Sequence, residues 1–318
     1  MHFDVFNGDA DGILALVQLR LHEPKQSTLV TGVKRDIALL KQVDVESANS
    51  VTVLDISMEK NIDALNKLVT NKISVDYVDH HRPGDIPDSE YLNATIDTDA
   101  NTCTSLLVNQ QLNSKYVLWA IAAAYGDNMI ASADQLAAQE KLSKEQAEQL
   151  KSLGIYINYN GYGRDVNDLH FTPSDLFKQL VEFDNPFDLI NQPNSIYHQL
   201  ATAYKDDMAK AKASPVLSDS NVLYVVELVD EPWARRVSGV YGNDLANQSP
   251  DKAHAVFTLN ADESYTVSLR APLNNKQGAG DICAQFETGG GRAAAAGINR
   301  LPKSELDKFI AVVSEYYA

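Results

Sequence analysis

Cysteine, basic charge and long apolar runs are all scarce in this chain of 318 residues. Its two cysteines, Cys103 and Cys283, lie far apart and do not form the close pair of a structural metal site, which favours a reducing compartment. No apolar run reaches the roughly 18 residues that would span a bilayer. Residues 1–12 enter a strand at once and carry no basic region followed by an apolar signal. The sequence therefore predicts a cytoplasmic protein without a membrane partner.

Negative charge dominates, since 43 Asp and Glu face 27 Lys and Arg and give a net charge of −16. Tight binding of long nucleic acid needs a basic surface that releases counterions. A long duplex is therefore not expected as a partner, and a bound nucleic acid should be short or held locally. The hydrophobic share of 44% supports a real core, and the length favours about two domains.

The most informative stretch is Ile73–Asp85, which reads ISVDYVDHHRPGD. Its β-branched run ends in Asp79, His80 and His81 and is followed by Pro and Gly, which predicts a buried strand that opens into a loop. Open α/β sheets bind ligands at the carboxyl ends of their strands. Taken alone, however, these three residues are better explained by a pair of surface histidines.

Four apolar elements of the chain end in a carboxylate in this way. The elements are the strands 2–6, 51–54 and 73–78 and the helix 116–125, and the carboxylates after them are Asp9 with Asp11, Asp55, Asp79 and Asp127. A single Asp at such a place is commonly a helix cap or a solvated turn. Repetition after successive elements of a parallel sheet predicts a common edge instead. Asp and His together suit Mn²⁺ or a similar divalent ion.

Four short segments resemble, in order and spacing, the four motifs of the DHH phosphoesterases. They are GDADG (8–12), LDIS (54–57), VDHH (78–81) and YGDN (125–128). Two later segments, VSLR (267–270) and GGGRAAAAG (289–297), are similar to the DHHA1 domain that follows the DHH domain in nanoRNases and related hydrolases. The resemblance covers both ends of the chain. It implies an α/β protein with a parallel-sheet DHH domain, a smaller α/β DHHA1 domain, and the active site in the cleft between them.

The expected domains are a DHH catalytic domain at 1–130, a helical and aromatic extension with a linker at 131–214, and a DHHA1 substrate-binding domain at 215–318. In the extension, helices are expected at 133–152, 173–183 and 194–213. In the last domain, strands are expected at 222–229, 253–260 and 264–271, helices at 235–247, 277–287 and 303–317, and a glycine turn at 289–291.

The resemblance also implies two divalent metal ions, with Mn²⁺ as the expected metal. The implied ligands are Asn7, Asp9, Asp11, Asp55, His80 and Asp127. Asp9 would bind the first ion, and Asp55 would bridge the two ions. Asp11, His80 and Asp127 would complete the ligands of the second ion. The family usually has His at the place of Asn7, so the first ion is expected to bind more weakly or to differ in kind.

The implied catalytic residues are Asp55, Asp79, His80 and His81. A hydroxide held between the two ions would attack phosphorus. Asp79 would orient His80 and so fix its tautomer, and His81 would face the substrate phosphate.

The other expected substrate-binding residues lie in two later regions: Arg270, Gly289, Gly290, Gly291 and Arg292 in the last domain, and Tyr159, Tyr162 and Arg164 in the extension. Arg292 stands where nanoRNases commonly have His, and an Arg guanidinium can bind a phosphate through two parallel hydrogen bonds. The glycines would let a phosphate or base approach backbone N–H groups, although a structural turn is the alternative. The segment 154–164 is interpreted either as a loop that packs its tyrosines onto the core or as a cap that offers them to bases.

The expected function is metal-dependent hydrolysis of short 5′-phosphorylated oligoribonucleotides, or of linear dinucleotides such as pGpG, to nucleoside monophosphates. The alternatives are a cyclic-dinucleotide phosphodiesterase, a pyrophosphatase, a single-strand exonuclease or a non-catalytic nucleotide-binding protein. The expected partners are a short RNA or a dinucleotide, and a second copy of the chain in a homodimer.

Overall fold

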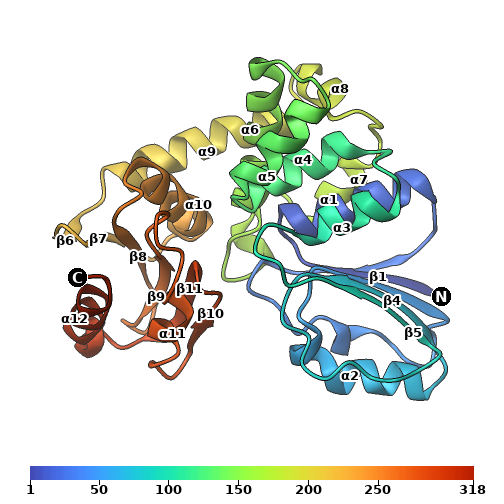
Figure 1. The fold of residues 1–318 in the computed structure, drawn as a ribbon, viewed down its shortest axis with the longest axis horizontal. Coiled ribbons are helices and arrows are strands. Elements are labelled where there is room, and N and C mark those ends of the chain that lie inside the picture. The colour runs from blue at the N-terminus through green and yellow to red at the C-terminus, as the bar shows by residue number, and fades with distance from the viewer. The chain divides into compact units, whose positions relative to one another are not determined.

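The chain forms two compact units in a computed structural model that describes residues 1–318. The units are Met1–Thr202 and Ala203–Ala318, and each contains one sheet with its own helices (Figure 1). The expected extension after residue 130 contributes its helices to the first unit as far as Thr202. No helix combines the length and the apolar character that crossing a membrane requires.

The first unit is built on five parallel strands in the order β2-β1-β3-β4-β5. Their bounds are β1 His2–Phe6, β2 Thr28–Val30, β3 Ser50–Leu54, β4 Ser74–Asp79 and β5 Leu92–Ile96. The chain passes from β1 to β2 on one side and then returns to the other side of β1 for β3. This reversal between β1 and β3 is a topological switch point, where open α/β sheets bind ligands.

Helices cover both faces of this sheet, because a parallel sheet is stable only when both faces are buried. In Figure 1, α1 (Ala10–His22), α3 (Thr104–Gln111) and α4 (Val117–Gly126) lie on one face and α2 (Met58–Thr70) lies on the other. The later helices are α5 Ile130–Gln139, α6 Lys144–Asn160, α7 Pro173–Leu180, α8 Pro186–Asn191 and α9 Ile196–Lys212. Short 3₁₀ turns occupy Leu40–Gln42 and Val166–Asp168.

The core between α2 and the sheet follows directly from the sequence pattern. Buried residues of α2 recur at helical spacing, as Met58, Leu65 and Leu68, and they pack on alternate strand residues such as Val53 and Tyr77. Burying one such aliphatic side chain contributes about 1.5–3 kcal/mol.

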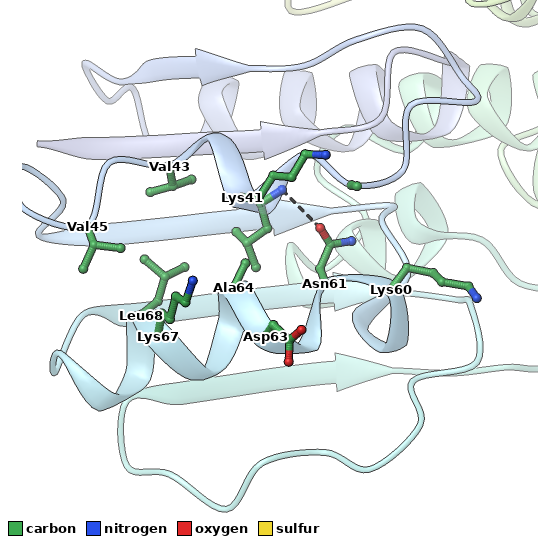
Figure 2. Close-up of a pocket in the computed structure, with 11 residues that line it drawn as sticks. Lys41, Val43, Val45, Lys60, Asn61, Asp63, Ala64, Lys67 and Leu68 are labelled. Carbon is green, nitrogen blue, oxygen red and sulfur yellow. Dashed lines mark hydrogen bonds between the residues drawn. The ribbon is translucent and has the colours of Figure 1, made fainter.

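One surface pocket of about 280 Å³ lies beside α2 (Figure 2). Lys41, Lys60 and Lys67 contribute to its lining, and Asn61 accepts a hydrogen bond from the backbone N–H of Leu40 at 3.2 Å. None of the residues expected to bind metal or substrate lines this pocket.

The second unit holds a six-stranded sheet in the order β10-β11-β9-β8-β7-β6, in which only β7 and β8 run parallel. Its strands are β6 Val216–Asp219, β7 Leu223–Leu228, β8 Ala253–Leu259, β9 Tyr265–Arg270, β10 Gly289–Gly291 and β11 Ala295–Leu301. Its helices are α10 Pro232–Gln248, α11 Ala279–Cys283 and α12 Leu306–Tyr317, preceded by a 3₁₀ turn at Lys303–Glu305. The helix α10 joins β7 to β8, since a parallel pair needs a crossover.

Four local expectations are corrected. The polar stretch 133–152 is two helices, because α6 starts anew with a capping box at Ser143, and α6 continues to Asn160. The segment 154–160 is therefore helical and is not a loop. The glycines at 289–291 form the edge strand β10 instead of a turn. The helix expected at 277–287 is the shorter α11, which is only five residues long.

Candidate metal centre

The carboxyl ends of β1, β3 and β4 bring distant segments to one edge of the first sheet. Phe6 pairs with Leu54, and Leu54 pairs with Val78, so these strands end side by side. The residues that follow them therefore enter the same region at the switch point.

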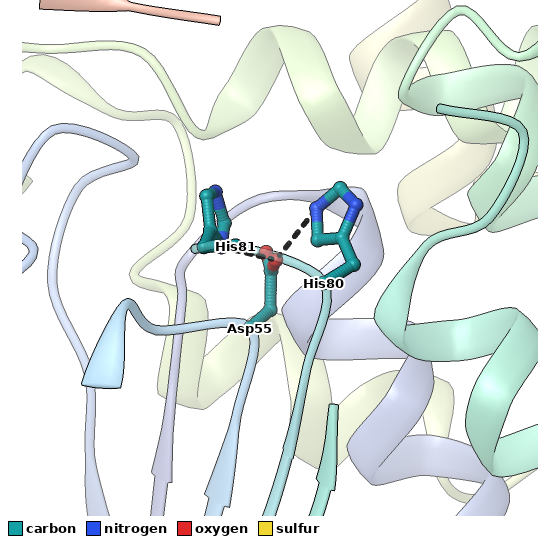
Figure 3. A group of neighbouring side chains, drawn as sticks. All are labelled: Asp55, His80 and His81. Carbon is teal, nitrogen blue, oxygen red and sulfur yellow. Dashed lines mark ion pairs between the residues drawn. The ribbon is translucent and has the colours of Figure 1, made fainter. Parts of the chain in front are cut away.

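Asp55, His80 and His81 form the tightest group at this edge. Figure 3 shows the Asp55 carboxylate between the two imidazole rings. Its Oδ1 lies 3.4 Å from His80 Nε2 and 3.8 Å from His81 Nδ1. One ligand atom from each residue lies within 4.8 Å of the others. Ligands about 2.1 Å from a common ion lie about 3–4 Å apart, and Asp55 Oδ1 and His80 Nε2 meet this spacing.

The backbone of Asp55 is in the left-handed region, with φ of 57°. Asp and Asn tolerate this conformation better than most residues, yet it commonly costs about 1–3 kcal/mol. The N–H of Asp55 donates to the carbonyl of Val78 at 3.1 Å, which ties the turn to β4. Such backbone conformations gather at functional sites, and this one places the carboxylate beside the two histidines.

Asp11 is held from behind by the start of α3. Its two carboxylate oxygens accept the backbone N–H groups of Thr104 at 2.8 Å and Ser105 at 2.7 Å. His80 Nε2 lies 3.8 Å from Asp11 Oδ2. A carboxylate has about four lone-pair sites, so Asp11 keeps capacity for an ion next to Asp55 and His80.

The orientation of the histidines corrects one expectation. His80 Nδ1 lies 3.1 Å from the carbonyl of Thr102, which holds the proton on Nδ1 and leaves Nε2 as a ligand atom. The resemblance implies that Asp79 orients His80, but Asp79 Oδ1 is paired with His81 Nδ1 at 2.7 Å. The side chain of His81 is 33% exposed and that of His80 only 3%, so His81 is the one that a substrate can reach.

The protonation of this group reflects crowded negative charge. Burial, and then the charges of Asp9 and Asp11, raise the pKa of Asp55 well above its ordinary value. Burial also raises the pKa of Asp11, although His80 opposes the shift. For His81, burial lowers the pKa, but the hydrogen bond to Asp79 and the nearby charges more than offset it, so the pKa is raised. A divalent ion would neutralise these carboxylates.

Lys34, which the sequence motifs do not single out, lies at the other side of the centre. Its ammonium is 2.6 Å from Asp9 Oδ2 and 3.4 Å from Asp127 Oδ1. Burial alone would raise the pKa of Asp9, but Lys34 more than offsets it and the pKa is lowered. Lys34 follows β2, and because parallel strands end at the same edge of a sheet, the loop after β2 enters this region.

Asn7 lies next to this lysine. Its amide Nδ2 donates to the carbonyl of Lys34 at 3.3 Å, and its Oδ1 is buried without a hydrogen-bond partner in the protein. The donors of the centre thus differ in their fit to metal. Asp11, Asp55 and His80 offer ligand atoms to one ion, whereas the Lys34 ammonium already contacts Asp9 and Asp127.

The tyrosines expected to stack on bases are buried. Tyr159 is 0% exposed and its hydroxyl lies 2.8 Å from His170 Nε2, so it offers no ring face to a base, which corrects that expectation. Tyr162 is 8% exposed, and the Lys34 ammonium lies 5.5 Å from its ring centroid. Arg164 is at the surface, and its backbone N–H donates to Asp168.

In the second unit, Arg270 is engaged by its own neighbours. Its guanidinium donates to Asn243 Oδ1 at 2.5 Å, to Ser268 Oγ at 3.0 Å and to the carbonyl of Gly239 at 3.1 Å. These bonds give Arg270 a structural role, whether or not it also meets a substrate.

The glycines of β10 have packing reasons of their own. A Cβ on Gly289 would lie 1.8 Å from the carbonyl oxygen of Cys283, and Gly291 has φ of 145°. Gly290 alone has open space around it, and Arg292 is exposed. The substrate role of these residues stays a prediction.

No protein-family model and no curated protein sequence matches the chain. Among solved structures, a DHH-domain protein described as a member of a family of ribosomal proteins matches with a TM-score of 0.64 and 13% identity, over 99% of this chain and 86% of that one. The exonuclease RecJ bound to manganese matches with a TM-score of 0.59 and 15% identity, over 99% and 90%. PggH from Vibrio cholerae, a pGpG-specific phosphodiesterase, matches with a TM-score of 0.55 and 13% identity, over 99% and 98%.

These similarities establish the architecture. The chain has the fold of the DHH-domain proteins, with a parallel-sheet unit followed by a smaller α/β unit. The expected α/β fold, with a parallel-sheet domain followed by a smaller α/β domain, is confirmed, and at 13–15% identity the comparison shows the fold alone.

Proposed function

We propose that this protein is a metal-dependent phosphodiesterase that hydrolyses short 5′-phosphorylated oligoribonucleotides or linear dinucleotides such as pGpG to nucleoside monophosphates. The observation that carries the proposal is the group of Asp55, His80 and His81 at the switch point of a DHH-type sheet. Two of the similar structures, RecJ and PggH, are an exonuclease and a pGpG-specific phosphodiesterase, which supports hydrolysis of a phosphodiester as the reaction.

The residues of the centre divide the work. A divalent ion held by Asp11, Asp55 and His80 would supply an activated water and a Lewis acid for phosphorus chemistry. Thr102 fixes the tautomer of His80 through its carbonyl. The start of α3 holds Asp11 in place through two backbone N–H groups.

His81 is the residue proposed to meet the substrate. Its Nδ1 is tied to Asp79, and this hydrogen bond together with the nearby carboxylate charges outweighs burial and raises its pKa. A protonated imidazole can donate a hydrogen bond to a phosphate oxygen and a proton to the departing oxygen. Partial exposure of the side chain leaves it accessible for this role.

A short substrate is supported by the charge of the chain. A net charge of −16 disfavours the counterion-driven binding on which long strands depend. A substrate of two nucleotides needs only local contacts to its 5′-phosphate and bases. Placement of the substrate between the two units, the DHHA1 role of residues 215–318, a homodimer and a cytoplasmic location stay predictions.

The test is hydrolysis of a substrate panel by protein stripped of metal and supplied with Mn²⁺. The panel contains pGpG, other linear dinucleotides, a cyclic dinucleotide, pyrophosphate and 5′-phosphorylated RNAs of increasing length. We expect kcat/KM to be highest for two nucleotides and to fall with each added nucleotide. The matched variants are Asp55→Asn, which should be inactive, and Asp63→Asn on the exposed face of α2, which should behave as the wild type.

Full activity in excess chelator would refute a metal-dependent reaction. Equal or rising efficiency with length would favour a single-strand exonuclease, and preference for the cyclic compound or pyrophosphate would move the assignment to those hydrolases.

A non-catalytic nucleotide-binding protein is a second candidate, because Asn7 and Lys34 depart from a two-ion centre. Dinucleotide binding without turnover in Mn²⁺ would select this candidate.

A further inference from the structure

The Lys34 ammonium has the surroundings of a bound cation. It lies 2.6 Å from Asp9 Oδ2, 3.1 Å from Asn158 Oδ1 and 3.4 Å from Asp127 Oδ1. An ammonium group has three N–H donors, so these three oxygens match its hydrogen-bonding capacity. The side chains of Asp9 and Asp127 are only 4% and 7% exposed, and Lys34 is their nearby positive charge.

The backbone holds Lys34 in this place from two sides. Its N–H donates to the carbonyl of Gly161 at 2.8 Å, and its carbonyl accepts from Asn7 Nδ2 at 3.3 Å. The loop before Lys34 also packs tightly on the loop after β1, since a Cβ on Gly8 would lie 1.9 Å from the carbonyl oxygen of Gly32. A lysine that merely reached from the surface would not need these contacts, so its position is built into the fold.

We infer that the Lys34 ammonium permanently takes the place of a second divalent ion, so that the centre binds one ion, at Asp11, Asp55 and His80. This inference rests on the metal centre in the proposed function and specifies how many ions it holds. An ammonium supplies one positive charge and fills its site with hydrogen bonds, but it offers no open coordination position. An ammonium in place of an ion agrees with Asn7, because Asn7 lacks the imidazole nitrogen that the family resemblance implies for a ligand of the first ion.

Removing Lys34 should expose a ligand set for a second ion. Asp9, Asp127 and Asn158 would each lose a partner, and Asn7 Oδ1 is already without a hydrogen-bond partner. All four offer oxygen atoms, which hard divalent ions such as Mg²⁺ and Mn²⁺ accept. A single substitution is therefore expected to change the number of ions bound.

The experiment counts Mn²⁺ per chain after equilibrium dialysis of the full chain, with spin coupling between neighbouring Mn²⁺ ions as a second signal in electron paramagnetic resonance. We expect one uncoupled ion in the wild type and two coupled ions in Lys34→Met, which keeps the side chain long but uncharged. Lys34→Arg retains the charge and should bind one ion. Lys67→Met, an exposed lysine on α2, controls for loss of a lysine in general and should also bind one ion.

Each result decides between the two proposals. Two ions in the wild type would overturn the role of Lys34 and leave the proposed hydrolase standing. No bound ion in the wild type would overturn the metal centre itself, and this inference with it. One ion in Lys34→Met would show that the lysine does not exclude a second ion. If Lys34→Met does not fold, the wild-type count and the Asn7→His variant decide: a second coupled ion in either, with Lys34 present, overturns the inference.

Discussion

Replacing Asp55 by Asn should stabilise the metal-free protein and at the same time abolish its response to Mn²⁺. Asp55 is 2% exposed and lies among other carboxylates, so its charge is costly when no ion is present. Asn has nearly the same shape and also tolerates the left-handed backbone at this position, where φ is 57°. The variant thus removes the charge and little else.

The magnitude follows from the geometry around His80. Asp11 Oδ2 and Asp55 Oδ1 both lie within 3.8 Å of His80 Nε2, so they are at most about 7 Å apart, and at an effective dielectric constant of 20 their repulsion is about 2 kcal/mol. We expect the free energy of unfolding of Asp55→Asn to exceed that of the wild type by about this amount. For a unit of this size, the melting temperature should rise by about 4–8 °C.

The sign of the pH dependence is a further check. The pKa of Asp55 is raised in the folded state. Its destabilising effect is therefore absent at a pH below the ordinary carboxyl pKa, grows as the pH rises above that value, and is complete above the raised pKa. The advantage of Asp55→Asn should therefore be small near pH 4 and grow toward neutral pH.

The assay is thermal and denaturant unfolding in excess chelator and again in Mn²⁺, with Asp63→Asn as the control. The wild type should gain stability from Mn²⁺, and Asp55→Asn should gain none. A variant that is less stable than the wild type in chelator, or that still responds to Mn²⁺, would refute the reasoning.

Three further predictions concern other parts of the first unit. Burial opposes the charge of Asp4, but its buried pair with Arg20 outweighs this and lowers the pKa of Asp4 to about 2. Its stabilisation of about 2 kcal/mol should be complete above about pH 4 and lost as the pH falls through about 2, and acid titrations of Asp4→Asn should lack this loss. His81→Gln should lower kcat while the Mn²⁺ content measured by dialysis stays at the wild-type value; loss of the ion would make His81 a ligand. Tyr159→Phe should lower the free energy of unfolding by about 0.5–1.5 kcal/mol and leave dinucleotide affinity unchanged. Weakened binding would show instead that Tyr159 contacts the substrate.

The central strands can be predicted because buried apolar residues recur along each of them. β1, β3 and β4 are short, and an Asp stands at or shortly after the end of each, at the common edge of the sheet. β2 escapes prediction because it is three residues long and half exposed at the edge of the sheet. The role of Lys34 cannot be predicted either, because nothing in the local pattern around residue 34 indicates which oxygen atoms its ammonium will contact.

The tyrosines of α6 show a different limit. The glycines and amides around these tyrosines suggest a loop. Their spacing of three residues, however, also suits one face of a helix. Tertiary contacts decide the outcome: α6 packs so closely on α4 that a Cβ on Gly154 would lie 1.9 Å from the carbonyl oxygen of Ala122. Such a contact between helices far apart in sequence cannot be predicted from either segment alone.

The bond from the Lys34 N–H to the carbonyl of Gly161 has a consequence for how the protein can be dissected. A fragment that stops at residue 130 keeps Asp9, Asp55 and Asp127 but loses the anchor of the loop that carries Lys34. It also loses Asn158 and the packing of α6 on α4. During synthesis on the ribosome, the same loop stays unanchored until α6 has emerged. A fragment that keeps this anchor must therefore extend at least past Gly161, and the compact unit that contains it ends at Thr202.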